Sequence, residues 1–476
     1  MKKFYITTSI AYTNALPHIG FALELVQVDV LARYHRILGE DVFFLTGTDE
    51  HGFKIAEAAE KAGKKPEVFV KEISDKFKEL DSILNISNDD FIRTTDEKRH
   101  WPVVEKVWKK FKEKGDLYLK DYTGWYCKGC EAFITKRKEE KGNCINHPNI
   151  KLELVQEKNY FFKLSKYSEK IRELIKSDKI KIIPEARKNE ILSIIDQGIE
   201  DISFSRSRKK FKWGIPVPDD EENQTVYVWV DALTNYISAL GYPKSEEFKK
   251  YWPADIQCVG KDILKFHVLI WPAMLLSLDL ELPKTIFVHG FITADGQKMS
   301  KSLGNVIDPF ELVKKYGADA VRYFLLREIP STEDGDFSYE KFEKRYNSDL
   351  AKGLGNLLAR TLTLAKKLNI KKANSSRANI NSFIANPKEK YNEALTSFKF
   401  SDALAAIWEI IGSLDKYIDK EEPWKGGGKS IKVVSNSLLV LEEIAKLLQP
   451  FLPQTSEKIL KQVETKESEI LFPIKK

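Results

Sequence analysis

The pattern of apolar and polar positions divides the chain into segments of different kinds. Near the N-terminus, short apolar and β-branched runs at residues 4–8 and 41–45 predict strands, and the helical periodicity of residues 19–38 predicts a helix between them. Gly39 stands where a helix C-terminal glycine belongs, and residues 46–49 are predicted to form a polar turn. This order is typical of a parallel sheet, which binds ligands at the carboxyl ends of its strands.

The strand–helix alternation is interrupted once. It stops at about residue 115 and returns after about residue 215, with strands predicted at residues 226–230, 256–259 and 285–288. We therefore expect one sheet domain that is split by an inserted segment.

The last part of the chain has a different pattern. After about residue 308 we expect no strand, and helical periodicity over residues 339–368, 401–417 and 431–448 predicts an all-α bundle. Polar loops are expected at residues 372–382 and 425–429. The expected domains are residues 1–114, 115–225, 226–307, 308–345 and 346–476.

Composition limits the class of protein. The 476 residues predict about three domains, and 42% hydrophobic with 31% charged residues exclude a fibrous or largely disordered chain. The longest apolar stretch, residues 268–278, is shorter than the ~20 residues of a membrane span and contains Pro272, so we expect no membrane association. The net charge of +7 permits a polyanionic partner without identifying one.

Three of the four cysteines form a pattern with a histidine. Cys127 and Cys130 are separated by two residues, and thirteen residues later Cys144 and His147 repeat that spacing. Each pair forms a tight turn that directs two ligands at one ion, which predicts a tetrahedral Zn²⁺ site over about residues 127–147. Since protein fills all four positions, the zinc is expected to be structural. Reduced cysteines indicate a cytoplasmic location, and Cys258 is predicted to be a core residue.

A first short motif follows the first predicted strand. Residues 17–20, Pro-His-Ile-Gly, place His18 and Gly20 at a helix N-terminus. Exposed backbone N–H groups and the helix dipole favour a phosphate there, and Gly20 lets a nucleotide approach the backbone. Taken alone, the segment is also compatible with an ordinary capped turn.

A second short motif, Lys-Met-Ser-Lys-Ser at residues 298–302, follows Asp295 and Gly296. Two lysines that flank a serine on a glycine-hinged loop suit a mobile clamp on phosphate. A solvated basic loop is the alternative.

In this order, on the two halves of a split sheet, the motifs resemble the HIGH and KMSKS signatures of class I aminoacyl-tRNA synthetases. Intervening segments narrow the resemblance to the methionyl-tRNA synthetase family: Thr-Asp-Glu-His-Gly at 48–52, Val-Trp-Val-Asp-Ala at 228–232, Val-Gly-Lys-Asp-Ile at 259–263, Phe-His at 266–267 and Phe-Val-His-Gly at 287–290. The resemblance covers residue 5 to about residue 453.

The resemblance implies the α/β fold of that family. The expected parts are a split Rossmann-type catalytic domain, a connecting insertion with one zinc knuckle, a stem-contact region and a C-terminal all-α anticodon-binding bundle. The implied enzyme is a ligase that activates L-methionine with ATP and transfers it to the 3′-terminal adenosine of tRNA(Met).

The resemblance also implies site residues. For ATP with Mg²⁺ they are His18, Gly20, Glu24, Gly260, Asp262, Lys298, Ser300 and Lys301, of which His18, Lys298 and Lys301 are catalytic. For methionine they are Ile10, Tyr12, Asp49, Trp229, Ala232, Tyr236, Ile263 and His267. Arg206 is a possible substrate contact, and Asn356, Arg360 and Trp424 match residues that read the anticodon. Without the resemblance, most of these site residues would be interpreted as core residues or solvated surface residues. Asp262 would be interpreted as a helix N-cap.

One departure from the family stands in the first motif. Phe21 occupies the place of the last HIGH histidine and cannot donate a hydrogen bond. Two alternatives therefore stay open: a class I synthetase for another amino acid, such as cysteine, and a catalytically inactive RNA-binding paralogue. The insertion is too small for the editing domain of the valine, isoleucine and leucine enzymes. Since the chain ends soon after the bundle, we expect a monomer.

Overall fold

The computed structural model describes residues 1–129, 132–134, 139–140, 143–144, 147–209, 212–220, 222–299, 304–370 and 380–475, with no side chains described for 132–134, 139–140 and 147–149. The chain forms two compact units, each built from three stretches. The first, here called the sheet unit, comprises Met1–Pro17, Gly39–Glu79 and Asn88–Val288. The second, the helical unit, comprises His18–Leu38, Leu80–Ser87 and His289–Lys476. The domain boundaries drawn from the sequence stay predictions.

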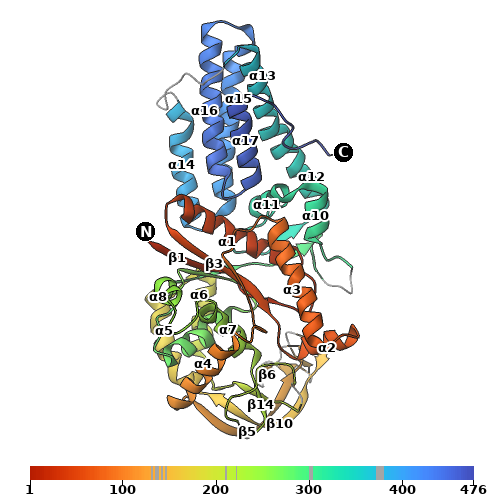
Figure 1. Ribbon diagram of the computed structural model, residues 1–476, viewed down its shortest axis with the longest axis vertical. Coiled ribbons are helices and arrows are strands. Elements are labelled where there is room, and N and C mark those ends of the chain that lie inside the picture. The colour runs from red at the N-terminus through yellow and green to blue at the C-terminus, as the bar shows by residue number, and fades with distance from the viewer. Residues whose placement is uncertain are drawn as a thin grey trace. The chain divides into compact units, whose positions relative to one another are not determined.

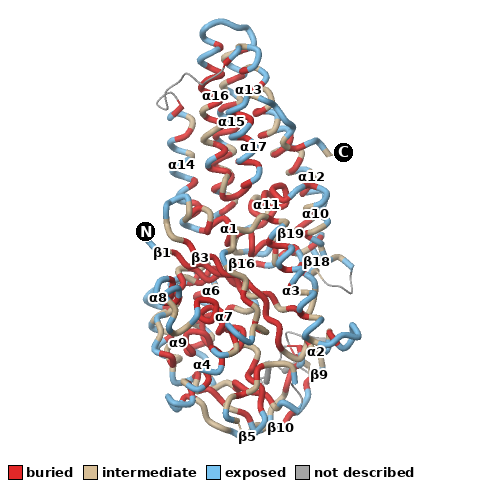
Figure 2. The backbone as a smooth tube through the Cα atoms, viewed as in Figure 1, coloured by how far each residue is buried: buried red, intermediate tan, exposed pale blue. Residues whose placement is uncertain are grey.

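A parallel sheet organises the sheet unit (Figure 1). Its strands are β1 (Lys3–Thr7), β2 (Ala11–Tyr12), β3 (Asp41–Asp49), β4 (Asp90–Arg93), β11 (Lys181–Ile183), β15 (Ile256–Gly260) and β16 (Thr285–His289). The order is β11-β16-β15-β1-β3-β2, with β4 also paired to β3. The pairs β1–β15, β1–β3, β2–β3, β3–β4 and β11–β16 are all parallel. Figure 2 shows β1 and β3 mostly buried, as expected for strands with helices on both faces.

The turn predicted at residues 46–49 is wrong, because β3 continues through it. Both β2 and β4 pair with this stretch, so its backbone groups are used in the sheet. Polar side chains of this stretch can be buried because they find polar partners. The Thr46 hydroxyl, for example, lies 2.8 Å from the hydroxyl of Thr8. Gly47 is needed for close packing, since a Cβ there would lie 2.1 Å from the carbonyl oxygen of Ile92.

The parallel strand predicted at residues 226–230 is also wrong. The chain forms β14 (Gln224–Val226), which pairs antiparallel with β13 (Ser205–Ser207), and α7 (Val228–Ser238) begins two residues later. The alternation of valine with aromatic residues in this segment is typical of a buried strand. A short apolar run is, however, equally compatible with the first turn of a buried helix. Here the helix forms, because its residues from Val230 to Ser238 are all buried.

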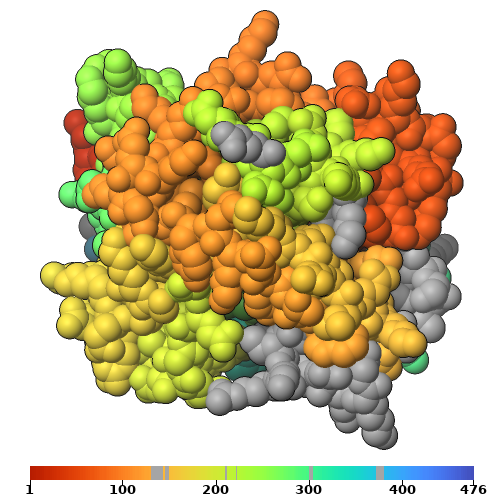
Figure 3. All heavy atoms as spheres, turned by 90° about the horizontal axis from the view of Figure 1, so that it is seen from below, coloured from red at the N-terminus to blue at the C-terminus, as the bar shows by residue number. Residues whose placement is uncertain are grey.

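The inserted segment adds an antiparallel sheet. Its order is β12 (Ile202–Ser203), β10 (Glu153–Phe162), β5 (Leu117–Cys127) and β6 (Ala132–Ile134). In the space-filling view, atoms from the orange and yellow parts of the chain lie against one another, as the pairing of β5 with β10 requires (Figure 3). The remaining elements of this unit are α2 (Phe53–Lys61), most of α3 (Pro66–Ile83), α4 (Trp101–Glu113), β7 (Glu139–Glu140), β8 (Asn143–Cys144), β9 (His147–Lys151), a 3₁₀ turn (Leu164–Tyr167), α5 (Ser168–Lys176), α6 (Glu185–Asp196), α8 (Glu246–Tyr251), a π-helical turn (Phe266–Ile270) and α9 (Trp271–Ser277).

The helical unit contains the predicted bundle. Its helices are α1 (Ile19–Ile37), α10 (Pro309–Tyr316), α11 (Ala318–Arg327), α12 (Tyr339–Arg345), a π-helical segment (Tyr346–Gly355), α13 (Asn356–Lys367), α14 (Asn381–Thr396), α15 (Phe400–Glu421), a 3₁₀ turn (Pro423–Lys425), α16 (Gly428–Leu448) and α17 (Pro453–Thr465). Figure 1 shows α13 and α14–α17 side by side. Contrary to expectation, a strand follows residue 308: β19 (Gly335–Phe337) joins β17 (Ile292–Ala294) and β18 (Gln297–Lys298) in a small sheet.

A buried ion pair fixes α1 within the helical unit. Nη2 of Arg322, on α11, lies 2.7 Å from Oδ2 of Asp29, and both side chains are fully buried. Arg322 also donates to the carbonyl oxygens of Pro450 and Phe451. Burial by itself would raise the pKa of Asp29, but the arginines beside it and the Ser87 hydroxyl hold that pKa below its usual value. Within the described residues, no helix combines the length and apolar character that crossing a membrane requires.

Candidate active site

The ends of two parallel strands bring Tyr12 and Asp49 together. These residues are register partners on β2 and β3, and the backbone oxygen of Asp49 accepts hydrogen bonds from the backbone N–H and hydroxyl of Thr13. Asp49 is 8% exposed. Ile10, just before β2, packs on the core of the same unit. A nearly buried carboxylate at this edge of the sheet is suited to pair with a cationic group.

One face of α7 carries three predicted methionine contacts. Trp229, Ala232 and Tyr236 are three and four residues apart, so they share a face of the helix. The Trp229 indole stacks on Phe266, with ring centroids 3.6 Å apart and planes within 4°. Phe266 was not among the predicted site residues, although it stands beside one of them in sequence.

A neutral histidine packs against the aromatic rings of this face. Nε2 of His267 lies 2.8 Å from the hydroxyl of Tyr236, and Nδ1 lies 3.1 Å from the carbonyl oxygen of Ile263. Burial lowers the pKa of His267 to about 4. The ring is therefore neutral at pH 7, with its proton on Nδ1 because the Ile263 carbonyl can only accept. The Tyr236 hydroxyl then donates to Nε2. Trp229, Tyr236, Ile263 and His267 thus form one contiguous cluster.

A buried network ties α7 to residues that follow β3. Nδ1 of His51 and Nε2 of His100 each lie 2.7 Å from the carboxylate of Asp231, on α7. Nδ1 of His100 also lies 2.7 Å from the hydroxyl of Ser238. Burial alone would raise the pKa of Asp231, but the two histidines hold it below its usual value. Sequence reasoning missed this network, although His51 and Asp231 lie in segments that carried the family resemblance.

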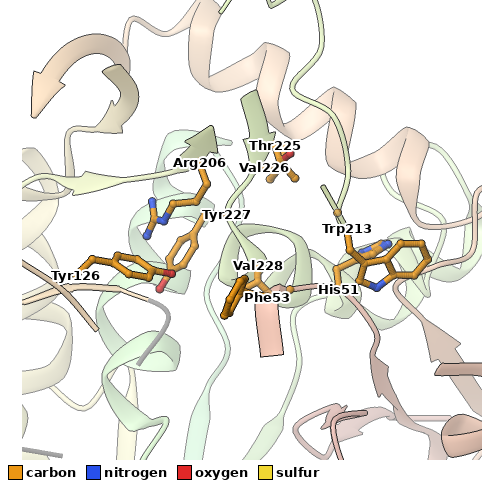
Figure 4. Close-up of a pocket in the computed structure, with 11 residues that line it drawn as sticks. His51, Phe53, Tyr126, Arg206, Trp213, Thr225, Val226, Tyr227 and Val228 are labelled. Atoms are coloured by element: carbon orange, nitrogen blue, oxygen red, sulfur yellow. The ribbon is translucent and has the colours of Figure 1, made fainter. Parts of the chain in front are cut away.

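Arg206 lies beside a pocket of the same unit. Its Nη1 donates to the carbonyl oxygens of Ser203 and Ser205, and its guanidinium lies 4.3 Å from the centre of the Tyr227 ring. The pocket is open to solvent and has a cavity volume of about 30 Å³. Figure 4 shows Arg206, Tyr126 and Tyr227 at one end and Trp213 with His51 at the other. Arg206 therefore lines the pocket, and a ligand bound there would lie beside it.

The predicted nucleotide contacts Gly260 and Asp262 follow β15. Gly260 ends the strand and is buried, whereas Asp262 is exposed in the turn that follows. Among the described residues, no hydrogen bond joins the Asp262 side chain to the following helix, so the alternative prediction of an N-cap is not met. Gly260 thus stands at the carboxyl end of a strand that neighbours β1.

His18 is the N-cap of α1, as predicted. Its Nδ1 accepts a hydrogen bond of 3.1 Å from the Gly20 N–H, so the proton of the neutral ring stands on Nε2. Desolvation lowers the pKa of His18, which favours that neutral form. The expectation of exposed N–H groups is wrong, because those of Ile19 and Phe21 bond to the carbonyl oxygens of Ile307 and His18. What His18 offers an anion is its ring N–H, together with the helix dipole.

Glu24 lies further along the same helix. It is buried, and its Oε2 lies 3.1 Å from Nε2 of His289. Nδ1 of His289 in turn lies 2.8 Å from the carbonyl oxygen of Gly290. Glu24 therefore ties α1 to His289, the last residue of β16.

The second motif begins at the end of a hairpin. Ala294 pairs with Gln297 around Asp295 and Gly296, which both have positive φ (50° and 73°), as a type I′ turn requires. The carboxylate of Asp336 accepts the Gly296 N–H at 2.7 Å. Lys298 is exposed where β18 ends. Ser300 and Lys301 lie outside the described residues.

The predicted anticodon residues lie on the helical unit. Asn356 is exposed at the start of α13, and Arg360, one turn further, bonds to Asp415 and Asp419 of α15 at 2.8 and 2.6 Å. Near the end of α13, Nζ of Lys367 lies 3.3 Å from the backbone carbonyl oxygen of Trp424. Trp424 itself is 41% exposed. The exposed indole suits stacking on an unpaired base.

Two of the four predicted zinc ligands can be placed in full. Cys127, at the end of β5, and Cys144, at the end of β8, are buried in one small cluster with Leu152. Cys144 and His147 are register partners across the antiparallel pair β8–β9. Cys130 and the His147 side chain lie outside the described residues, so the four-ligand set stays a prediction. Cys258 is fully buried in β15, which confirms it as a core residue.

Comparison with known proteins agrees with this arrangement. The family described as "tRNA synthetases class I (M)" matches residues 4–153 and 144–362, and the "Anticodon-binding domain of tRNA ligase" family matches residues 378–476. A methionine–tRNA ligase of Thermotoga maritima is 45% identical over 98% of this chain and 76% of its own length. One of Brucella suis is 42% identical over 96% of this chain and 91% of its own length.

A solved structure has the same fold. Mycobacterium tuberculosis methionyl-tRNA synthetase in complex with methionyl-adenylate superposes with a TM-score of 0.92, at 37% identity, over 100% of this chain and 99% of its own. Its apo form gives a TM-score of 0.84 at 35% identity, over 97% and 91%. This chain belongs to the methionine–tRNA ligase family of class I tRNA synthetases.

Proposed function

We propose that this chain is a methionine–tRNA ligase that charges tRNA(Met) for translation initiation and elongation. The observation that carries the proposal is the cluster formed by Trp229, Tyr236 and His267, in a fold that matches a synthetase solved with methionyl-adenylate. The cluster is aromatic with one fixed polar edge, as suits recognition of a thioether side chain.

In the first step, the methionine carboxylate attacks the α-phosphorus of ATP, and the bond to the bridging oxygen breaks to release pyrophosphate. Asp49 holds the substrate ammonium group. Lys298, Lys301 and the ring N–H of His18 stabilise the negative charge on the phosphates, and Mg²⁺ would neutralise more of it. No side chain acts as a nucleophile, so catalysis is positioning and charge stabilisation. Gly20, Glu24, Gly260, Asp262 and Ser300 complete the proposed ATP site.

In the second step, a ribose hydroxyl of the terminal adenosine attacks the methionyl carbonyl carbon. The bond from that carbon to the phosphate oxygen breaks, AMP leaves, and the hydroxyl proton is released. Asn356, Arg360 and Trp424 would read the anticodon. We also propose that one structural Zn²⁺ is held by Cys127, Cys130, Cys144 and His147, since two buried cysteines in one cluster fit such a donor set. A cytoplasmic monomer without membrane association completes the proposal.

Methionine-dependent ATP–pyrophosphate exchange on zinc-loaded protein, without tRNA, tests the activity. We expect exchange with methionine and none with cysteine or leucine. Exchange with cysteine instead would reassign the substrate. No exchange from folded, metal-replete protein, combined with binding of tRNA, would favour the inactive RNA-binding paralogue.

A further inference from the structure

The proposed methionine site is built from two parts of the chain that are far apart in sequence. Asp49, for the ammonium group, ends β3, whereas Trp229, Ala232 and Tyr236, for the side chain, lie on one face of α7. An amino acid can contact both parts at once only if β3 and α7 are held at a fixed separation. Whatever sets that separation therefore also sets which length of side chain the site accepts.

The buried network lies between these two parts. His51 follows Asp49 by two residues, and Asp231 immediately precedes Ala232 on α7. Nδ1 of His51 lies 2.7 Å from Oδ2 of Asp231, and each residue is 1% exposed. Because the Asp231 carboxylate is ionised and can only accept, His51 donates this bond. One buried, charge-assisted hydrogen bond thus joins the ammonium end of the site to the helix that carries the side-chain face.

The stretch from residue 49 to residue 51 is held as one piece. Glu50, in its middle, is fully buried, and its carboxylate accepts from Nε and Nη2 of Arg93 over 2.7 and 2.9 Å. The Glu50 backbone N–H donates to the Thr94 hydroxyl over 2.9 Å, and its backbone oxygen accepts from the Trp213 indole N–H over 2.6 Å. The histidine at one end of this stretch therefore cannot shift without the aspartate at the other.

His100 holds the other oxygen of the same carboxylate. Its Nε2 lies 2.7 Å from Oδ1 of Asp231, and its Nδ1 lies 2.7 Å from the hydroxyl of Ser238, about two turns further along α7. His100 is itself fully buried, directly before α4. Because α7 is held at two points along its length, it can neither slide nor rotate about its axis without breaking a buried hydrogen bond.

We propose that His51, His100 and Asp231 are positioning residues that set the separation between Asp49 and the methionine-binding face of α7, and with it the length of the amino acid that is activated. None of the three has to touch the substrate. The proposal rests on the proposed function and adds the residues that hold its amino-acid site in shape. A purely structural network would change the fraction of folded protein, whereas a positioning network changes the affinity for one substrate.

The two histidines bond to Asp231 through opposite ring nitrogens, which provides a matched set of variants. Asparagine can place its amide nitrogen where Nδ1 was, and glutamine can place it where Nε2 was. His51→Asn and His100→Gln therefore keep the bond to Asp231, whereas His51→Gln and His100→Asn lose it. Nε2 of His51 has no hydrogen-bond partner among the described residues, so His51→Asn gives up no further bond there.

Pyrophosphate exchange gives kcat and the KM for each substrate in all four variants. We expect the KM for methionine to rise roughly tenfold where the bond is lost, and less than about twofold where it is kept. The KM for ATP should stay within about twofold of its unaltered value, because none of these bonds involves a proposed ATP contact.

Two results would overturn the proposal. One is the same KM for methionine in both variants of each histidine. The other is a loss confined to kcat, which a smaller folded fraction produces by itself. Failure of exchange in the unaltered protein would count against the proposed function instead.

Ser238→Ala covers the case in which the variants without the bond do not fold. It removes one hydroxyl, which also lies 3.3 Å from the carbonyl oxygen of Asn235, and leaves both bonds to Asp231 in place. Since the His100 ring loses a contact that orients it, the KM for methionine should rise about threefold while the KM for ATP stays the same. An unchanged KM for methionine in folded Ser238→Ala would contradict the proposal.

Selectivity for length is the second readout. A site of fixed length discriminates by about 10–200-fold against one extra methylene, such as that of ethionine, the S-ethyl analogue of methionine. The ratio of kcat/KM for methionine to kcat/KM for ethionine should fall roughly tenfold in His51→Gln and His100→Asn, and stay unchanged in their matched partners. The same ratio in all four variants would overturn the role of the network in setting length.

Discussion

The hydroxyl of Tyr236 donates its one proton to Nε2 of His267, 2.8 Å away. The opposite nitrogen of that ring donates to the backbone of Ile263, so the orientation and tautomer of His267 are both fixed. The Tyr236 hydroxyl consequently keeps oxygen lone pairs and has no free proton. This pair is the polar edge of an otherwise apolar site, and its charge state is the first property to test.

Acid should destabilise the protein through His267. The unfolded ring binds a proton near pH 6.5 and the native ring near 4, so between these values the unfolded state binds more protons and stability rises with pH. The contribution is complete above pH 6.5 and is lost as pH falls to 4, on the order of 3 kcal/mol. Urea unfolding of the unaltered protein and of His267→Gln should show their stability difference shrinking by that amount from pH 7.5 to 4. A difference independent of pH would contradict this assignment.

Removing Arg322 should destabilise the helical unit. The Arg322→Met variant leaves the carbonyl oxygens of Pro450 and Phe451 without their buried donor and takes one cation from Asp29. Breaking a buried pair in this way costs about 3–5 kcal/mol. Arg33→Met is the matched control, because Arg33 bonds to the same Asp29 but is partly exposed, and it should cost less. Urea unfolding that ranks the two variants in the reverse order would refute the argument.

Trp424→Ala should raise the KM for tRNA. Loss of one base-stacking surface costs about 1–3 kcal/mol, so an effect of roughly 5- to 150-fold is expected. Because the residue is 41% exposed, the free energy of unfolding should change little. Trp424→Phe should restore most of the tRNA affinity, since it keeps an aromatic face. If pyrophosphate exchange falls as far as charging does, Trp424 is structural.

Metal analysis should find one zinc per chain. Cys127→Ser removes a predicted ligand from a buried cluster, so it should lower the metal content and the thermal stability of the protein together. Cys258→Ser is the control: this residue is equally buried but lies in the parallel sheet, so its loss should leave the zinc content unchanged. Full zinc occupancy in Cys127→Ser would exclude that ligand set.

The effect of Phe21 can be measured directly. It lies in the first turn of α1, where its backbone N–H bonds to the carbonyl oxygen of His18. Phe21→His restores a side-chain donor, and a missing donor costs ~3 kcal/mol in other active sites, so the exchange rate should rise up to about 100-fold. No increase, at unchanged KM for methionine, would mean that the site already compensates for phenylalanine.

Local sequence determined much of this protein. The periodicity of α1 and of the helices at 401–417 and 431–448 depends on residues within a few positions of one another, and each forms as predicted. The roles of Lys298, Asp49 and the other site residues came from motif resemblance and stay predictions, since residue types at fixed spacing carry chemistry but not geometry.

Tertiary structure decided the rest. Residues 46–49 become strand because β2 and β4 pair with them, and residue 228 begins a helix because α7 is buried along nearly its whole length. His51 and His100 meet Asp231 across more than a hundred positions of sequence, and Ile19 finds its acceptor at Ile307. Local propensity is a weak preference between strand, turn and helix. Partners that are distant in sequence decide the outcome, because burial and pairing of backbone groups contribute more free energy than propensity does.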